Sequence, residues 1–185
     1  RCGENEAKAF VEALAATPID KISLRAWNLF PRGDPFECLA SFLFLLKALF
    51  AALASKTLKA THLDLSRMPA ELLMNDVVKV IERNLNSLAT ITDLDLSRNH
   101  FFGDKGYEAW AEDLAEALKE NRTLKRLNLA HNEIGDTGVQ ALAEALKVNC
   151  TLKRLNVAYN RIDDTGVKEL AEALKENRTL KRLNL

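Results

Sequence analysis

The sequence contains few of the residues that build covalent cross-links or metal centres. It has 3 cysteines and 3 histidines in 185 residues, and Cys2, Cys38 and Cys150 form no C-x-x-C pair. An odd number of isolated cysteines argues against a disulfide framework and indicates a reducing compartment, so we expect a cytoplasmic location. No two histidines share the i, i+4 spacing of a zinc site on a helix. We therefore expect no metal and no cofactor.

The chain also lacks net charge and any visible catalytic set. Its 26 basic residues balance 26 acidic ones, which excludes a bulk attraction to nucleic acid or to an anionic membrane. It has no Gly-rich phosphate loop, and no nucleophile, base and orienting group can be recognised together. Cys150 lies beside a threonine that recurs in the chain, and we expect it to be packed rather than reactive. The sequence therefore predicts a protein that is not an enzyme.

What the sequence does contain is repetition. The nine residues NRTLKRLNL occur at Asn121–Leu129 and again at Asn177–Leu185, with NCTLKRLNV at Asn149–Val157 between them. The copies are spaced 28 residues apart and share the pattern L-x-x-L-x-L-x-x-N, the signature of a leucine-rich repeat. Their leucines predict a short strand, and the apolar residues within 139–146 have the spacing of a helix with one buried face. Neither element can bury its apolar face alone, so the repeats must stack on one another.

The pattern loosens toward the N-terminus, where the units that begin at Ile19 and Ile91 are longer than 28 residues. An asparagine that can satisfy backbone groups as the chain leaves the strand occurs in only some repeats. It is found at Asn99, Asn132 and Asn160. We therefore predict a single domain over residues 1–185 with about six repeats, irregular in 1–90 and regular in 91–185.

Residues 91–185 resemble the ribonuclease-inhibitor subclass of leucine-rich-repeat proteins, with LNLAHNEIGDTGVQALAEALKVN as the cleanest copy. The resemblance implies an α/β solenoid, a curved right-handed β-α horseshoe with parallel strands on its concave face and helices on its convex face. Members of this subclass include the sensor regions of NOD-like receptors, ribonuclease inhibitors, Ran GTPase activators and effectors that bacteria inject into host cells. They share the binding of other proteins, although a fold alone does not fix a function. The resemblance thus implies a protein–protein interaction module.

One segment, Cys38–Ala54, is apolar on nearly every side. Its 17 residues fall short of the roughly 20 that span a membrane, and Lys47 lies at its centre. We expect no membrane span and a buried helix on the convex side. The alternative is a hydrophobic docking patch for a flanking segment.

Strand alternation predicts where a partner binds. If Leu127 and Leu129 point inward, Arg126 and Asn128 point to the opposite, concave face. Stacked repeats then form a surface that changes from acidic to basic along the solenoid, and Arg and aromatic side chains supply most interface hot spots. The predicted partner-binding residues are Asp64, Asp93, Asp95, Arg98, Arg126, His131, Arg154, Tyr159 and Arg182. The alternative is that these are solvated strand residues multiplied by duplication.

Two further motifs have structural interpretations. The N-x-[ST] acceptors at Asn121, Asn149 and Asn177 would suggest glycans in a secreted protein, but all three fall just after a helix. Asparagine suits the left-handed residue that ends a helix. The Asp-Thr-Gly segments at 136–138 and 164–166 are predicted to hold helix N-caps rather than a phosphate.

The chain begins without Met inside half a repeat and stops at Leu185 within a strand, so we expect a fragment of a longer protein. A strand that closes a solenoid leaves an open edge, which either further repeats or a second copy in a homodimer would cover. Two other functions stay open. One is a regulator of a small GTPase. The other is a targeting or scaffold region of a larger receptor or bacterial effector, acting in the host-cell cytoplasm.

Overall fold

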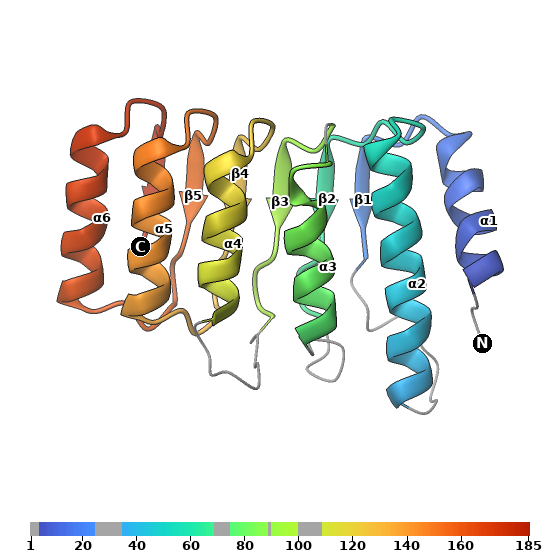
Figure 1. Cartoon of the computed structure of the whole chain (residues 1–185), viewed down its shortest axis with the longest axis horizontal. Helices are drawn as coiled ribbons and strands as arrows, with labels where there is room; N and C mark the ends of the chain where they lie inside the picture. The colour runs from blue at the N-terminus through green and yellow to red at the C-terminus, as the bar shows by residue number, and fades with distance from the viewer. Residues whose placement is uncertain (1–3, 25–34, 69–74, 89, 100–108) are drawn as a thin grey trace.

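The computed structural model describes residues 4–24, 35–68, 75–88, 90–99 and 109–185. Within these residues helices and strands alternate in one order: α1 (Glu4–Ala15), β1 (Lys21–Ser23), α2 (Pro35–Ala54), β2 (His62–Asp64), α3 (Asn75–Leu85), β3 (Asp93–Asp95), α4 (Ala109–Glu120), β4 (Arg126–Asn128), α5 (Asp136–Val148), β5 (Arg154–Asn156), α6 (Asp164–Glu176) and β6 (Arg182–Asn184). Figure 1 shows the helices side by side in one layer and the strands in a second layer behind them. Each strand with the helix beside it is one step of a solenoid.

The strands form one parallel sheet in the order β1-β2-β3-β4-β5-β6, so every strand pairs with its neighbours in the sequence. The central residues of the strands lie in register across the sheet, from Ile22 in β1 to Leu183 in β6. A parallel connection needs a crossover, and the helices supply it. The predicted α/β leucine-rich-repeat solenoid of parallel strands and helices is confirmed.

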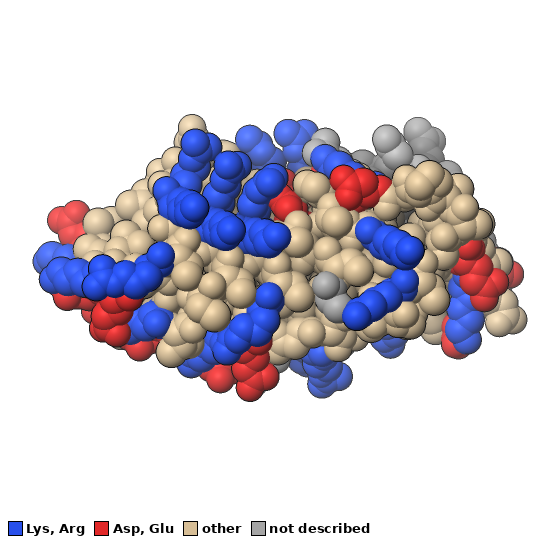
Figure 2. Space-filling model, turned by 90° about the horizontal axis from the view of Figure 1, so that it is seen from above, with Lys and Arg blue, Asp and Glu red and all other residues tan. Residues whose placement is uncertain are grey.

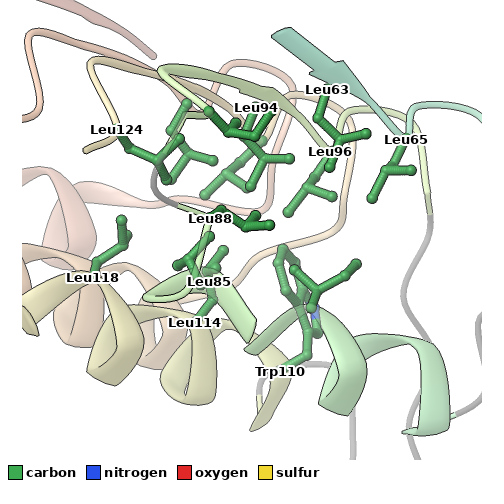
Figure 3. Close-up of a cluster of buried hydrophobic side chains, with 14 of the residues drawn as sticks. Leu63, Leu65, Leu85, Leu88, Leu94, Leu96, Trp110, Leu114, Leu118 and Leu124 are labelled. Carbon is green, nitrogen blue, oxygen red and sulfur yellow. The ribbon is translucent and has the colours of Figure 1, made fainter. Parts of the chain in front are cut away.

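The core fills the space between the two layers. Leu63 and Leu94 point from the strands toward leucines of the helices and of the loops that precede the strands, as Figure 3 shows. Both side chains are at most 2% exposed, and so is Leu85 at the end of α3. Trp110 of α4 lies at the border of this cluster. The leucine pattern is therefore the signal that places each strand against its helix.

The repeat asparagines form a ladder through the interior. The Nδ2 atom of Asn132 donates to the carbonyls of Leu96 (2.8 Å) and Leu129 (3.1 Å), and its Oδ1 atom accepts from the N–H of Asn99 (2.8 Å). Asn160 repeats the arrangement one step on, where its Oδ1 atom accepts from the N–H of Asn132 (3.0 Å). Asn99 and Asn132 are fully buried. The predicted role in satisfying backbone groups at the strand ends is confirmed.

A second asparagine ladder follows the helix ends. Asn149 accepts through Oδ1 from the N–H groups of Thr151 (3.0 Å) and Leu152 (2.8 Å), and its Nδ2 atom donates to the carbonyls of Leu118 and Asn121 in the preceding repeat. Its φ of −72° and ψ of 124° are extended. The expected left-handed conformation is therefore wrong. Asparagine is used here because one side chain serves donors and acceptors of two repeats.

The predicted helix caps lie one residue too late in the sequence. The N-cap of α6 is Asp163, whose side chain accepts from the N–H of Thr165 (2.6 Å), and the N-cap of α5 is Gly135. Asp136 instead reaches the next repeat, where its Oδ1 atom accepts from the N–H groups of Asp163 (3.0 Å) and Gly166 (3.2 Å). A carboxylate at the first turn of α6 is favourable because the N–H groups there lack partners within the helix.

The apolar segment Cys38–Ala54 forms most of α2. Its side chains Phe42, Leu46 and Leu53 are fully buried, while Lys47 is exposed. The prediction of a packed helix is confirmed. In the part of the chain that the structure describes, no helix is long and apolar enough to cross a membrane.

Candidate partner-binding face

The outer face of the sheet, called here the strand face, carries two columns of polar side chains. Because alternate residues of a strand point to opposite sides, the first and third residue of each strand lie opposite its central apolar residue. The first column consists of Lys21, His62, Asp93, Arg126, Arg154 and Arg182. The second consists of Ser23, Asp64, Asp95, Asn128, Asn156 and Asn184. All of these residues except Ser23 line a groove of about 630 Å³ that runs from β1 to β6.

A third set of residues, the rim column, lies where the chain leaves β2 to β5. Its members are Arg67, Arg98, His131 and Tyr159, whose φ angles lie between 57° and 60°. Apart from Gly, Asn, Asp and His, residues rarely adopt this left-handed conformation. The rings of His131 and Tyr159 stack at 4.2 Å with an interplanar angle of 9°, and Tyr159 is 77% exposed. The rim column therefore presents large side chains on a backbone that disfavours them.

The acidic residues of the second column are engaged within the domain. Asp64 is only 4% exposed, and its carboxylate accepts from the N–H (3.0 Å) and the hydroxyl (2.7 Å) of Ser66 and from the hydroxyl of Ser23 (3.1 Å). Asp95 makes the same pair of bonds to Ser97 in the next repeat. These hydrogen bonds hold the turns that follow β2 and β3. The two carboxylates contribute little accessible charge to the strand face.

Asp93 joins the acidic half of the face to the basic half. Its carboxylate forms an ion pair with Arg126 (2.8 Å) and accepts from the hydroxyl of Thr92 (2.7 Å). His62 lies between Asp93 and Asp20, with its ring nitrogens 3.7 Å and 3.6 Å from their carboxylates. His62 was not among the predicted residues, although the strand alternation in T-H-L-D-L would have placed it in the first column.

The basic half covers β4 to β6. Two successive cations lie at the start of each of these strands, and we call the six residues the basic rows: Lys125, Arg126, Lys153, Arg154, Lys181 and Arg182. All six are exposed. Figure 2 shows Lys and Arg side chains gathered in parallel ridges over these strands, with the nearest acidic side chains toward β1 to β3. Among the described residues Arg126 is the one member of the rows that forms an ion pair.

Metal-binding clusters are absent from the described part of the chain. No group of three or more His, Cys, Asp or Glu residues there could hold a metal ion. Cys150 is exposed at the start of the loop before β5, so the expectation that it is packed is wrong. It follows Asn149, whose own side chain occupies the interior at this turn.

Comparison with known proteins shows which family of leucine-rich-repeat proteins includes this sequence. Residues 76–185, more than half of the chain, match the family described as "TMOD/LMOD Leucine-rich domain". The chain belongs to this family. The TMOD/LMOD leucine-rich domains are not enzymes, and the prediction of a non-enzymatic domain is confirmed. The expectation of an injected bacterial effector is wrong, because the match is to a different family of leucine-rich repeats.

Two solved structures share the architecture of this TMOD/LMOD domain. One is named "Leiomodin-1 Actin-Binding Site 2 (ABS2)", with a TM-score of 0.54 and 20% identity over 97% of this chain and 77% of that chain. The other is a tropomodulin C-terminal domain from Caenorhabditis elegans, with a TM-score of 0.63 and 10% identity over 94% of this chain and 92% of that one. At such identities the likeness shows the fold alone. No curated protein sequence matches the chain.

Proposed function

We propose that this domain is a non-catalytic binding module for actin and that the strand face makes the contact. The observation that carries the proposal is the family match, taken together with the likeness to a leiomodin-1 structure that is named as an actin-binding site. A cytoplasmic location is part of the proposal and is supported by the isolated, exposed Cys150.

The charge on the strand face supports this surface as the contact. Arg154 and Arg182 are exposed and form no ion pair with any residue that the structure describes. Holding like charges one strand apart is unfavourable for folding, since facing pairs of like charge destabilise a sheet. A partner that brings carboxylates to this face relieves the repulsion. Opposite charge also speeds association, which then weakens as salt is added.

The rim column supports the same surface. Tyr159 is the most exposed large apolar side chain among those that the structure describes, and its ring is held by the stack on His131. A rigid aromatic side chain loses little conformational entropy on binding, and Tyr and Arg dominate interface hot spots. Backbone strain of this kind persists where the surrounding structure enforces it, and it clusters at functional sites. We therefore assign the contact to Arg98, Arg126, His131, Arg154, Tyr159 and Arg182, with Asp64, Asp93 and Asp95 shaping the face from within.

The test is direct binding to purified monomeric actin. Arg154→Glu combined with Arg182→Glu should weaken binding at least tenfold and flatten its dependence on salt, because two attractive charges become repulsive. Lys168→Glu on α6 is the control for a single charge reversal and should leave binding unchanged, since it changes charge away from the strand face. Thermal melting of each variant checks folding.

Two results would contradict the proposal. If the unaltered chain does not bind actin at micromolar concentrations, actin is not the partner. If the double variant binds as well as the unaltered chain while the Lys168 variant loses affinity, the contact lies on the helix side.

A further inference from the structure

We propose that the element of the partner seated on the strand face is an α-helix with an acidic stripe, lying along the solenoid axis across β4 to β6. This inference rests on the proposed use of the strand face for protein binding, but it does not depend on the partner being actin. It comes from the spacing of the basic rows, the width of the face and the nature of its two borders.

The spacing along the solenoid favours a helix. Arg126, Arg154 and Arg182 occupy equivalent positions in paired strands. Parallel strands lie about 4.8 Å apart, so the first and third arginine start about 9.6 Å apart. Carboxylates at i and i+7 on one face of a helix are about 10.5 Å apart, with a further carboxylate at i+3 or i+4 between them. The mismatch is about 1 Å over the whole set.

An extended segment fits this spacing less well. Side chains on one face of an extended segment repeat about every 6.6 Å, so three of them span about 13 Å. The three arginines of the domain span about 9.6 Å. The second row, Lys125, Lys153 and Lys181, has the same 28-residue spacing and doubles the number of cations along the axis. These lysines precede the arginines by one residue and do not line the groove, so they add positive potential at its border while the arginines make the contacts.

The width of the strand face also suits a helix. The basic rows lie at the start of each strand, and the stacked rings of His131 and Tyr159 lie at its end. From Arg154 to Tyr159 the chain advances five residues, which is at most about 17 Å when extended. A helix with its side chains is about 10–12 Å across, so one helix fits between the two borders. Its acidic stripe would then face the cations, and apolar side chains on its flank would contact Tyr159.

The floor of the groove disfavours a strand added through backbone hydrogen bonds. The amides of Asn128, Asn156 and Asn184 bond to one another, at 2.9 Å between the first two and 3.0 Å between the last two. The strands below them already pair on both sides as far as β5. The face therefore offers side-chain contacts, which a helix uses, rather than an open row of backbone groups.

The experiment uses three synthetic alanine-rich peptides of known helicity. The first is a stapled helix with glutamates at i, i+4, i+7 and i+11 and leucines on the flank, and the second has the same composition with the glutamates spread around the helix. The third keeps the stripe but contains two central prolines. Fluorescence anisotropy should show the striped helix binding about tenfold more tightly than the other two. Arg154→Glu with Arg182→Glu should abolish the difference, and Lys168→Glu should preserve it.

Equal affinity for the three peptides would overturn the inference, because only total charge would then matter. Inorganic polyphosphate serves as the probe for a general polyanion site. If it displaces the striped helix at equal charge concentration, the basic rows bind polyanions without regard to shape and the inference is wrong. If the domain binds actin but does not discriminate among the peptides, the inference of a helical partner is wrong and the proposed function stands. If the domain discriminates among the peptides but does not bind actin, the inference of a helical partner stands and the proposed function is wrong.

Discussion

Replacing Asn132 by alanine should destabilise the domain far more than the same change at Asn156. The two asparagines make the same number of side-chain hydrogen bonds. Asn132 bonds to the carbonyls of Leu96 and Leu129 and to the N–H of Asn99, and it is fully buried. Asn156 makes its bonds on the half-buried strand face. The comparison therefore separates burial from bond number.

The magnitude follows from which groups lose their only side-chain partner. The carbonyl of Leu96 also accepts from Asn99, and that of Leu129 also accepts from Asn160, so both keep one bond in the variant. The N–H of Asn99 is left buried without its acceptor, which costs about 1–3 kcal/mol. The two lost second bonds add about 0.5–1 kcal/mol each. We expect Asn132→Ala to lower the free energy of unfolding by about 2–5 kcal/mol.

Asn156→Ala should cost less than about 1 kcal/mol, because water replaces the bonds that it loses on the open face. Urea unfolding followed by far-UV circular dichroism and by tryptophan fluorescence measures both values, and coincident transitions justify a two-state treatment. The melting temperature of the Asn132 variant should fall by about 2–4 °C for each kcal/mol that is lost from its free energy of unfolding. Equal losses for the two variants would refute the reasoning, since burial would then not decide the cost.

Three further changes test other parts of the fold. Gly166→Ala should lower stability by about 1–2 kcal/mol, because the added Cβ would lie 2.6 Å from the hydrogen-bonded Oδ1 atom of Asp136 and 2.8 Å from the Cγ2 atom of Ile162, which outweighs the roughly 1 kcal/mol that alanine gains over glycine in a helix; a raised urea midpoint would contradict the packing described at this contact. Arg98→Gly should raise stability by about 1 kcal/mol through relief of the left-handed backbone while weakening actin binding, and urea unfolding with binding titrations measures the two effects. Hydrogen bonding with Asp136 and with the N–H of Thr165 lowers the pKa of Asp163 below its ordinary value of 3.8, so its stabilising contribution is present above that pH and lost as pH falls through the lower folded value. Asp163→Asn should therefore make the melting temperature less sensitive to acid below about pH 4.

The repeat pattern was sufficient to predict the arrangement of the sheet and its buried leucines. Once Leu127 and Leu155 are placed at equivalent positions, the register of Arg126 against Arg154 follows, and with it most of the strand face. The 28-residue period carries this information because each repeat meets its neighbour through the same contacts. The apolar character of Cys38–Ala54 on nearly every side was also enough to predict that α2 is a packed helix.

The local backbone could not be predicted in the same way. Arginine and tyrosine disfavour positive φ, so nothing in their identity indicates the left-handed residues Arg98 and Tyr159. Asparagine favours that conformation, yet Asn149 is extended because its side chain is needed by two repeats at once. The burial of Asp64 was likewise hidden, since it depends on the turn that brings the Ser66 N–H to its carboxylate. These features are set by contacts across repeats rather than by propensity.

The equal register of β4, β5 and β6 makes the length of the domain adjustable. Removing residues 124–151 would join Thr123 to Leu152, and the joined chain would again read N-R-T-L-K-R-L-N. Arg154 would then take the place of Arg126 beside Asp93, and Asn160 would take the place of Asn132 beneath Asn99. Recombination between such segments can therefore add or remove one repeat while the contacts between neighbouring repeats stay the same. Each such event changes the length of the strand face by one strand width, about 4.8 Å, and its charge by two positive charges, so the number of repeats sets the length of the basic half.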